Sequence, residues 1–230
     1  MKLTKVTFTG IDDRTDVKRL QQLQRRYPFV EFGVLLSYDW NVNGNRFINP
    51  VYLSIFRDRG LNFSAHFCGQ SAYDIAIGKR EEMEKLLGNN IGMFQRCQLN
   101  LDAGKLRYLS PIPYIDEIIV QMYTVEMCRE FLECTRPKSV SYLLDASCGA
   151  GIDTPIEIVT SPGINIGYAG GIGPDNVEKK LRKLLDYPSD EKFWIDMETR
   201  VRTDDWFDLD KVEQVLKICD AMIKEQSPSK

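Results

Sequence analysis

The fold is decided by one stretch, Gly167-Tyr168-Ala169-Gly170-Gly171-Ile172-Gly173-Pro174-Asp175-Asn176-Val177. Apolar residues lead into a glycine pair, and a Pro-Asp-Asn turn opens a helical pattern that continues through Leu181 and Leu184. The order is strand, glycine turn, helix. Glycines let the backbone approach a ligand closely, and unpaired N–H groups at a helix start attract an anion such as phosphate. The stretch therefore predicts either a phosphate site or a plain turn that needs glycine for its backbone angles.

The same alternation runs along the whole chain. Strand patterns lie at 4–9, 29–37, 61–68, 93–101, 117–123, 140–145, 165–169 and 193–198. Helical patterns follow Asp16, Pro50 and Val125, lie within 71–88, 155–159 and 209–223, and follow Asn176. Eight repeats without consecutive hairpins predict an α/β protein, a (β/α)8 TIM barrel with a single domain over residues 1–230. A Rossmann fold is disfavoured because Gly10 stands alone after the first strand.

Composition excludes several classes of function. The chain is 43% hydrophobic with a net charge of −3, so no basic surface for nucleic acid is expected. No apolar run approaches the roughly 18 residues that a membrane span needs, and we expect a cytoplasmic protein. Six scattered cysteines without a CxxC pair predict reduced thiols. A single histidine, His66, cannot build a histidine metal site, and no metal or cofactor is expected.

In such a barrel the active site lies where the strands end. Polar residues predicted at those ends are Thr9, Ser37, His66, Asn100, Asp145, Asp196 and Glu198. Lys138 and Lys192 precede their strands, so a Schiff-base lysine is not expected.

Asp145 is the sharpest candidate because it ends the apolar run 140–144. Partial burial there would favour the protonated carboxyl that a general acid needs, although a strand-end Asp also serves to cap the following turn. We expect Asp196 and Glu198 to pair with Arg200 and Arg202, which follow at once.

Two further residues are open to two interpretations each. His66 is either a hydrogen-bonded residue at a strand end or a group that contacts the ligand. Arg46, in an otherwise neutral loop, either clamps a ligand carboxylate bidentately or is simply solvated.

Several segments together resemble phosphoribosylanthranilate isomerase, a (β/α)8 enzyme of tryptophan biosynthesis. Val6-Thr7-Phe8-Thr9-Gly10-Ile11 is similar to its first-strand motif, and Asn45-Arg46-Phe47-Ile48-Asn49-Pro50 to its Ser-x-Arg-x-Ile-x-Pro loop. Leu143-Leu144-Asp145 with Gly149-Ala150-Gly151 resembles its Leu-Leu-Asp and Gly-Ser-Gly, and 169–177 its Ala-Gly-Gly-Leu-x-x-x-Asn-Val. The segments occur in the family's order across almost the whole chain.

The resemblance implies an Amadori rearrangement, an aldose–ketose isomerisation of a phosphoribosyl amine by general acid and base catalysis. It places Asp145 on the family's acid and Arg46 on the residue that holds the substrate carboxylate. The phosphate would be held by Gly149, Gly151, Gly170, Gly171, Thr199 and Arg200. The family's basic cysteine is Thr9 here, whose hydroxyl has too high a pKa to act as a base unless another group activates it.

Other positions also depart from the family's pattern. Its last-strand Ser-x-Val-Glu reads Thr199-Arg200-Val201-Arg202, and its fourth-strand Gln-Leu-His-Gly reads Gln98-Leu99-Asn100-Leu101. Asp12, Asp13 and His66 are candidates for a replacement base.

Three hypotheses follow for the function. The first is an isomerase of this family's type, and the second is a related sugar-phosphate isomerase with another substrate. The third is a non-catalytic barrel that binds a phosphorylated ligand and has lost its base. Each predicts a small phosphorylated sugar as partner, with no nucleic acid and no membrane, for a monomer or homodimer.

Overall fold

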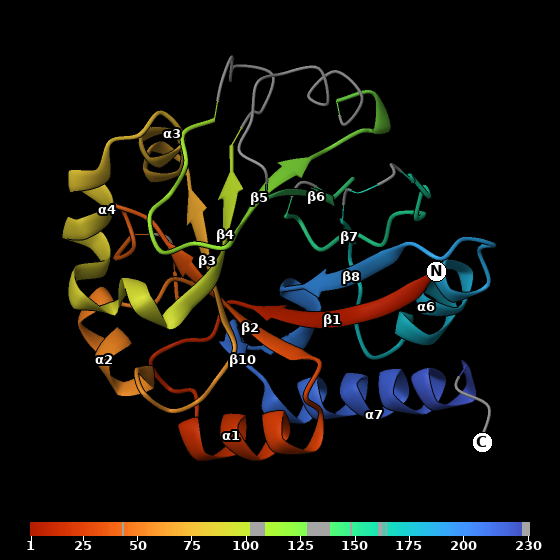
Figure 1. Ribbon diagram of the computed structural model, residues 1–230. Coiled ribbons are helices and arrows are strands. Elements are labelled where there is room, and N and C mark those ends of the chain that lie inside the picture. Colours follow the sequence, from red (N-terminus) through yellow and green to blue (C-terminus); the bar gives the residue numbers. More distant parts are fainter. Residues whose placement is uncertain are drawn as a thin grey trace.

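Eight parallel strands form a closed barrel in chain order (Figure 1). The computed structural model describes residues 1–226 apart from 43, 102–108, 128–138, 148, 161–162 and 164, and leaves out the side chain of Arg80. The strands are β1 (Lys2–Thr9), β2 (Val30–Leu36), β3 (Phe63–Cys68), β4 (Phe94–Asn100), β5 (Glu117–Met122), β6 (Val140–Leu144), β7 (Ile166–Tyr168) and β8 (Lys192–Met197). Each pairs with its sequence neighbour, and β1 closes the ring against β8 with Val6 opposite Ile195. The predicted barrel is confirmed.

The helices lie outside the ring of strands (Figure 1). They are α1 (Val17–Arg26), α2 (Leu53–Phe56), α3 (Gln70–Ala76), α4 (Arg80–Leu87), α6 (Val177–Leu185) and α7 (Leu209–Gln226), with 3-10 turns η1 (Pro50–Tyr52), η2 (Gly88–Met93) and η4 (Thr199–Val201). A short hairpin of β9 (Arg202–Thr203) and β10 (Trp206–Phe207) follows η4. Within the described ranges, no helix has both the length and the apolar character to cross a membrane.

Side-chain caps explain where two of the helices start. The Asp16 carboxylate accepts the backbone N–H groups of Lys18 and Arg19 at 2.8 and 3.3 Å, so α1 begins directly after it. Asp208 accepts the N–H of Asp210 at 2.9 Å and that of Lys211 at 3.2 Å at the start of α7. The helical patterns predicted after Asp16 and over 209–223 are thereby confirmed.

Three further predicted helices differ from the structure or lie largely outside the residues that it describes. The pattern within 71–88 predicted a helix. The structure has two helices there, α3 and α4, with Gly78 between them at φ +88°. Residues 155–159 form no helix, so that prediction is wrong. The helical pattern after Val125 lies largely outside the described residues.

Strand alternation separates the two sides of the barrel wall. On β1, Val6 and Phe8 are buried in the apolar core. Thr7 faces the interior instead, where its hydroxyl donates to Glu31 at 3.0 Å. The closed sheet therefore carries an apolar layer outside, and inside it polar side chains lie together with a small apolar cluster of Ile119, Leu143 and Trp194.

Arg96 is the central charge of this interior. Its guanidinium donates to Glu31 at 2.7 Å and to Glu117 at 2.8 Å, and it lies 4.5 Å from the centre of the Trp194 ring. Four strands meet through these contacts, because the residues lie on β2, β4, β5 and β8. The group fills the barrel below the strand ends and leaves the space above it open.

Candidate active site

A cavity of about 290 Å³ opens at the carboxyl ends of the strands. Its lining includes side chains that the sequence predicted at strand ends, namely Thr9, His66, Asn100, Asp145, Asp196 and Glu198. The glycines predicted to hold phosphate, Gly149, Gly151, Gly170 and Gly171, line the same cavity with Thr199 and Arg200. Residues far apart in the sequence therefore meet where a barrel carries its chemistry.

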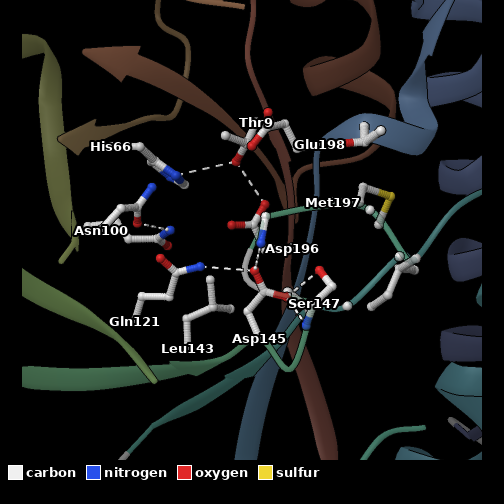
Figure 2. A pocket seen from close by; sticks show the side chains of 18 of the residues that line it. Thr9, His66, Asn100, Gln121, Leu143, Asp145, Ser147, Asp196, Met197 and Glu198 are labelled. Carbon is white, nitrogen blue, oxygen red and sulfur yellow. Dashed lines mark hydrogen bonds between the residues drawn. The ribbon is translucent and has the colours of Figure 1, made fainter. Parts of the chain in front are cut away.

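Thr9, Asp196 and His66 form one hydrogen-bonded group. The Thr9 hydroxyl donates to Asp196 Oδ1 at 2.8 Å and lies 3.4 Å from His66 Nδ1. Figure 2 shows Asp196 between the Thr9–His66 pair and Asp145. Thr9 of the first strand is thus bonded to a carboxyl group from the last strand.

Asp196 holds its proton more tightly than an ordinary aspartate. Burial raises its pKa to about 8, and the negative charges of Glu198 and Asp145 act in the same direction. The hydrogen bond from Thr9 opposes that shift. The residue as a whole is 5% exposed. At neutral pH the group is mostly protonated, which is the form that a general acid requires.

His66 is a neutral imidazole. Burial lowers its pKa to about 3, and the charge of Arg96 contributes to the shift. Its Nε2 lies 2.8 Å from the Ser64 hydroxyl. The ring therefore offers a hydrogen bond to neighbours or ligand and carries no charge at neutral pH.

Asp145 has the opposite surroundings to Asp196. Its Oδ1 accepts the backbone N–H and the hydroxyl of Ser147 at 3.0 and 2.7 Å. Its Oδ2 accepts Gln121 Nε2 at 2.9 Å and the N–H of Gly149 at 2.8 Å. Two donors on each oxygen are the arrangement that an ionised carboxylate makes.

Two glycine turns border the cavity beside Asp145. Gly149 and Gly151 have φ of +79° and +69°, and Gly170 and Gly171 have +103° and +62°. A Cβ on Gly171 would lie 2.4 Å from the Ile152 carbonyl oxygen, so only glycine fits there. The turns bring backbone to the cavity wall close to Arg200, and this is suited to a phosphate group.

Lys180 of α6 holds one of these turns in place. Its ammonium donates to the carbonyl oxygens of Thr154 and Gly170 at 2.6 and 2.8 Å and pairs with Asp153 at 2.7 Å. The side chain is 9% exposed. A buried cation thus ties the helix to the turn that precedes it.

Arg46 lies behind the cavity wall and does not belong to its lining. Its guanidinium donates to Glu198 at 3.0 Å, to Thr199 at 3.0 Å and to Asp205 at 2.8 Å. Burial alone would lower its pKa, but the bond to Asp205 and the charge of Glu198 outweigh burial and raise it. Its predicted role as a clamp for a ligand carboxylate stays a prediction.

The expected pairing of Asp196 and Glu198 with the arginines that follow them is wrong. Arg200 pairs with Asp175, and Arg202 pairs with Asp12 at 3.2 Å. The chain leaves β8 and turns through η4 directly after Glu198, so these acids and the arginines that follow them point in different directions.

The candidates for a replacement base lie in different places. Neither Asp12 nor Asp13 lines the cavity. Asp12 is held by Arg202 and by the N–H of Phe207 at 2.7 Å, and Asp13 is exposed. Of the three candidates, His66 reaches the cavity.

Sequence reasoning did not single out Gln121, Ser147 or Cys68 as site residues, although all three line the cavity. A signal existed for Gln121, because it is the lone amide in the apolar run 117–122. Burial raises the pKa of the Cys68 thiol to about 12, so it is not a thiolate at neutral pH. Cys68, Cys97 and Cys219 are free, as expected for the cysteines that the structure describes.

Comparison with known proteins gives a likeness in fold. No protein-family model and no curated protein matches the chain. The phosphoribosyl anthranilate isomerase from Thermus thermophilus is 17% identical with a TM-score of 0.60, over 96% of this chain and all of its own. The N-(5'-phosphoribosyl)anthranilate isomerase from Pyrococcus furiosus is 13% identical with a TM-score of 0.57, over 95% of this chain and 99% of its own.

A third similar structure is the phosphoribosyl anthranilate isomerase from Thermococcus kodakaraensis. It is 14% identical with a TM-score of 0.56, over 94% of this chain and 98% of its own. The chain therefore resembles these barrels along nearly its whole length. At such identities the likeness concerns the fold.

Proposed function

We propose that this protein is an aldose–ketose isomerase that acts on a phosphorylated ribosylamine, the reaction implied by the resemblance to phosphoribosylanthranilate isomerase. One observation carries the proposal: Asp145 and Asp196 share a cavity but lie in opposite environments. In enzymes, two carboxyl groups take the acid and the base role when their surroundings give them different proton affinities. Glycine turns at the same cavity support a phosphorylated substrate.

The two carboxyl groups divide the proton transfers between them. Asp196 carries a proton at neutral pH and gives it to the ring oxygen, which breaks the C1–O bond and opens the sugar. Asp145, as a carboxylate, takes the proton from C2. The nitrogen lone pair forms a C1=N bond as the C1–O bond breaks, and its electrons return to nitrogen when those of the C2–H bond form the C1=C2 bond of an enaminol. A proton then adds to C1 and the C2 hydroxyl gives up its proton, which leaves the ketone. This assignment exchanges the role that the sequence suggested for Asp145.

The surrounding side chains position these two groups. Thr9 donates its hydrogen bond to Asp196 and thereby orients the carboxyl group, so a hydroxyl in place of a basic cysteine needs no activation. Gln121 and Ser147 hold Asp145 from two sides, which keeps the carboxylate from rotating away from the substrate. Thr9 is thus a positioning residue in this mechanism.

The test is conversion of phosphoribosylamines to their ketose products, followed by NMR, with several amines joined to ribose 5-phosphate. We expect turnover, and a loss of about 10²-fold or more in kcat for Asp145→Asn and for Asp196→Asn. The matched control is Asp190→Asn, which changes an exposed aspartate far from the site and should keep full activity.

The pH profile tests the role of Asp196 directly. Because the acid must be protonated, kcat/KM should fall as the pH rises through about 8. Thr9→Val removes the bond that opposes the shift, so the fall should move to higher pH, whereas Thr9→Ser should not move it. Tight binding of a reduced product without turnover of any substrate would overturn the proposal in favour of a non-catalytic binder.

A further inference from the structure

The charge of the side chains that line the cavity changes from negative to positive along the segment that follows β8. Glu198 packs against the β1 and β2 side, where its Cγ lies 3.7 Å from the position of a Cβ on Gly10. Arg200 packs against Gly173 beside the glycine turn at β7, where a Cβ on Gly173 would lie 2.6 Å from that of Arg200. Both side chains line the cavity. A phosphate fits the end with Arg200 and the glycines, so the other half of the ligand meets Glu198.

The positive charge near Glu198 is already compensated. Arg46 and Arg202 are held by three carboxylates, from Glu198, Asp205 and Asp12, with N–O distances from 2.8 to 3.5 Å. We call these five residues the Arg46 cluster. Its formal charge is −1, and the member that lines the cavity is an acid. A carboxylate arriving from the cavity would meet Glu198 before it reached Arg46.

The remaining lining at this end is apolar or neutral. Leu35 and Phe47 are joined by a backbone bridge and both line the cavity. Thr9 and the uncharged ring of His66 complete the wall. Such a wall suits an uncharged hydrocarbon or aromatic group, while the Glu198 carboxylate suits an N–H donor beside it.

From this charge pattern we infer that the amine half of the substrate carries no carboxylate: the cavity selects a ribose phosphate joined to a neutral amine, and Glu198 excludes an acidic one. The inference rests on the proposed isomerase function and names its substrate class. It separates this protein from enzymes whose substrate is built on anthranilate, because that amine bears a carboxylate.

Stable ligands test the inference without turnover. Ribose 5-phosphate is condensed with aniline or with anthranilate and reduced, which yields two open-chain phosphates that differ by one carboxylate. Calorimetry gives the dissociation constant of each for the intact protein. We expect the phenyl compound to bind about tenfold or more tightly than the carboxyphenyl compound.

Glu198→Gln identifies the residue responsible. It should strengthen binding of the carboxyphenyl compound by about tenfold and change that of the phenyl compound little, because the repelling charge is removed and Arg46 is released. Glu178→Gln, on the exposed face of α6, is the matched control and should leave both constants unchanged.

The outcomes separate the two proposals. Tighter binding of the carboxyphenyl compound to the unmodified protein would overturn the inference and leave the isomerase function standing. An unchanged preference in a folded Glu198→Gln variant would overturn the role of Glu198. Failure of both compounds to bind at millimolar concentration would overturn the proposed function and the inference together.

Discussion

Asp196 and Asp145 line the same cavity, yet the hydrogen bonds and charges around their carboxyl groups differ. Asp145 accepts four hydrogen bonds, whereas the structure gives Asp196 a bond from Thr9 and like charges nearby. Sequence reasoning identified both residues at strand ends. It could not distinguish their protonation, because the Gln121 donor to Asp145 comes from the neighbouring strand and the contact of Asp196 with Thr9 joins the two ends of the chain.

Burial of Asp196 should make stability depend on pH. Its folded pKa of about 8 lies above the ordinary value of 3.8, so the native state holds an additional proton between these limits. Stability is therefore lost as the pH rises through this window. Asp196→Asn should be more stable than the unmodified protein above pH 8, by on the order of a few kcal/mol, and the advantage should shrink toward pH 4.

Urea unfolding at a series of pH values measures this difference. His66 supplies an internal contrast, because its folded pKa of about 3 lies below the ordinary 6.5. Its contribution is present above pH 6.5 and lost as the pH falls toward 3. An Asp196→Asn advantage that stays constant from pH 4 to 9 would show that the carboxyl titrates normally in the folded protein.

At the scale of elements, α6 and the turn before it behave as one unit. Lys180 joins them through two carbonyl oxygens and Asp153. Lys180→Met should destabilise the protein by about 3 kcal/mol and weaken phosphate binding, because buried acceptors lose their charged partner. Thermal unfolding with and without inorganic phosphate measures both effects. Lys179→Met, on the exposed side of the same helix, should change neither, and equal effects of the two variants would contradict the prediction.

Element boundaries were predicted where the signal is local. Asp16 caps the helix predicted to follow it, and short runs rich in apolar residues mark all eight strands. The division of 71–88 into two helices was not predicted, because both halves keep the helical spacing. The break depends on Gly78, where a Cβ would lie 2.9 Å from the Ser110 hydroxyl, a contact between distant segments.

At the scale of the whole molecule, the charged interior joins strands from around the barrel. Arg96→Met should destabilise the protein by about 3–5 kcal/mol, because Glu31 and Glu117 would lose the guanidinium that neutralises their charges inside the barrel. Chemical denaturation at neutral pH measures the loss. Adding Glu31→Gln and Glu117→Gln to this variant should recover part of it, since neutral amides are less costly to bury. A loss unchanged in the triple variant would contradict this account.

The sequence by itself determined the closed barrel, the strand ends that carry polar residues and the glycine turns, because periodicity, caps and positive backbone angles are properties of short segments. The tertiary structure alone decided which charges meet. It placed Arg46 against Glu198, turned Arg200 and Arg202 toward other acids and buried Asp196 beside Thr9. Proton affinity and charge compensation depend on the distances between charged groups from segments far apart in the chain, and closing the barrel sets those distances.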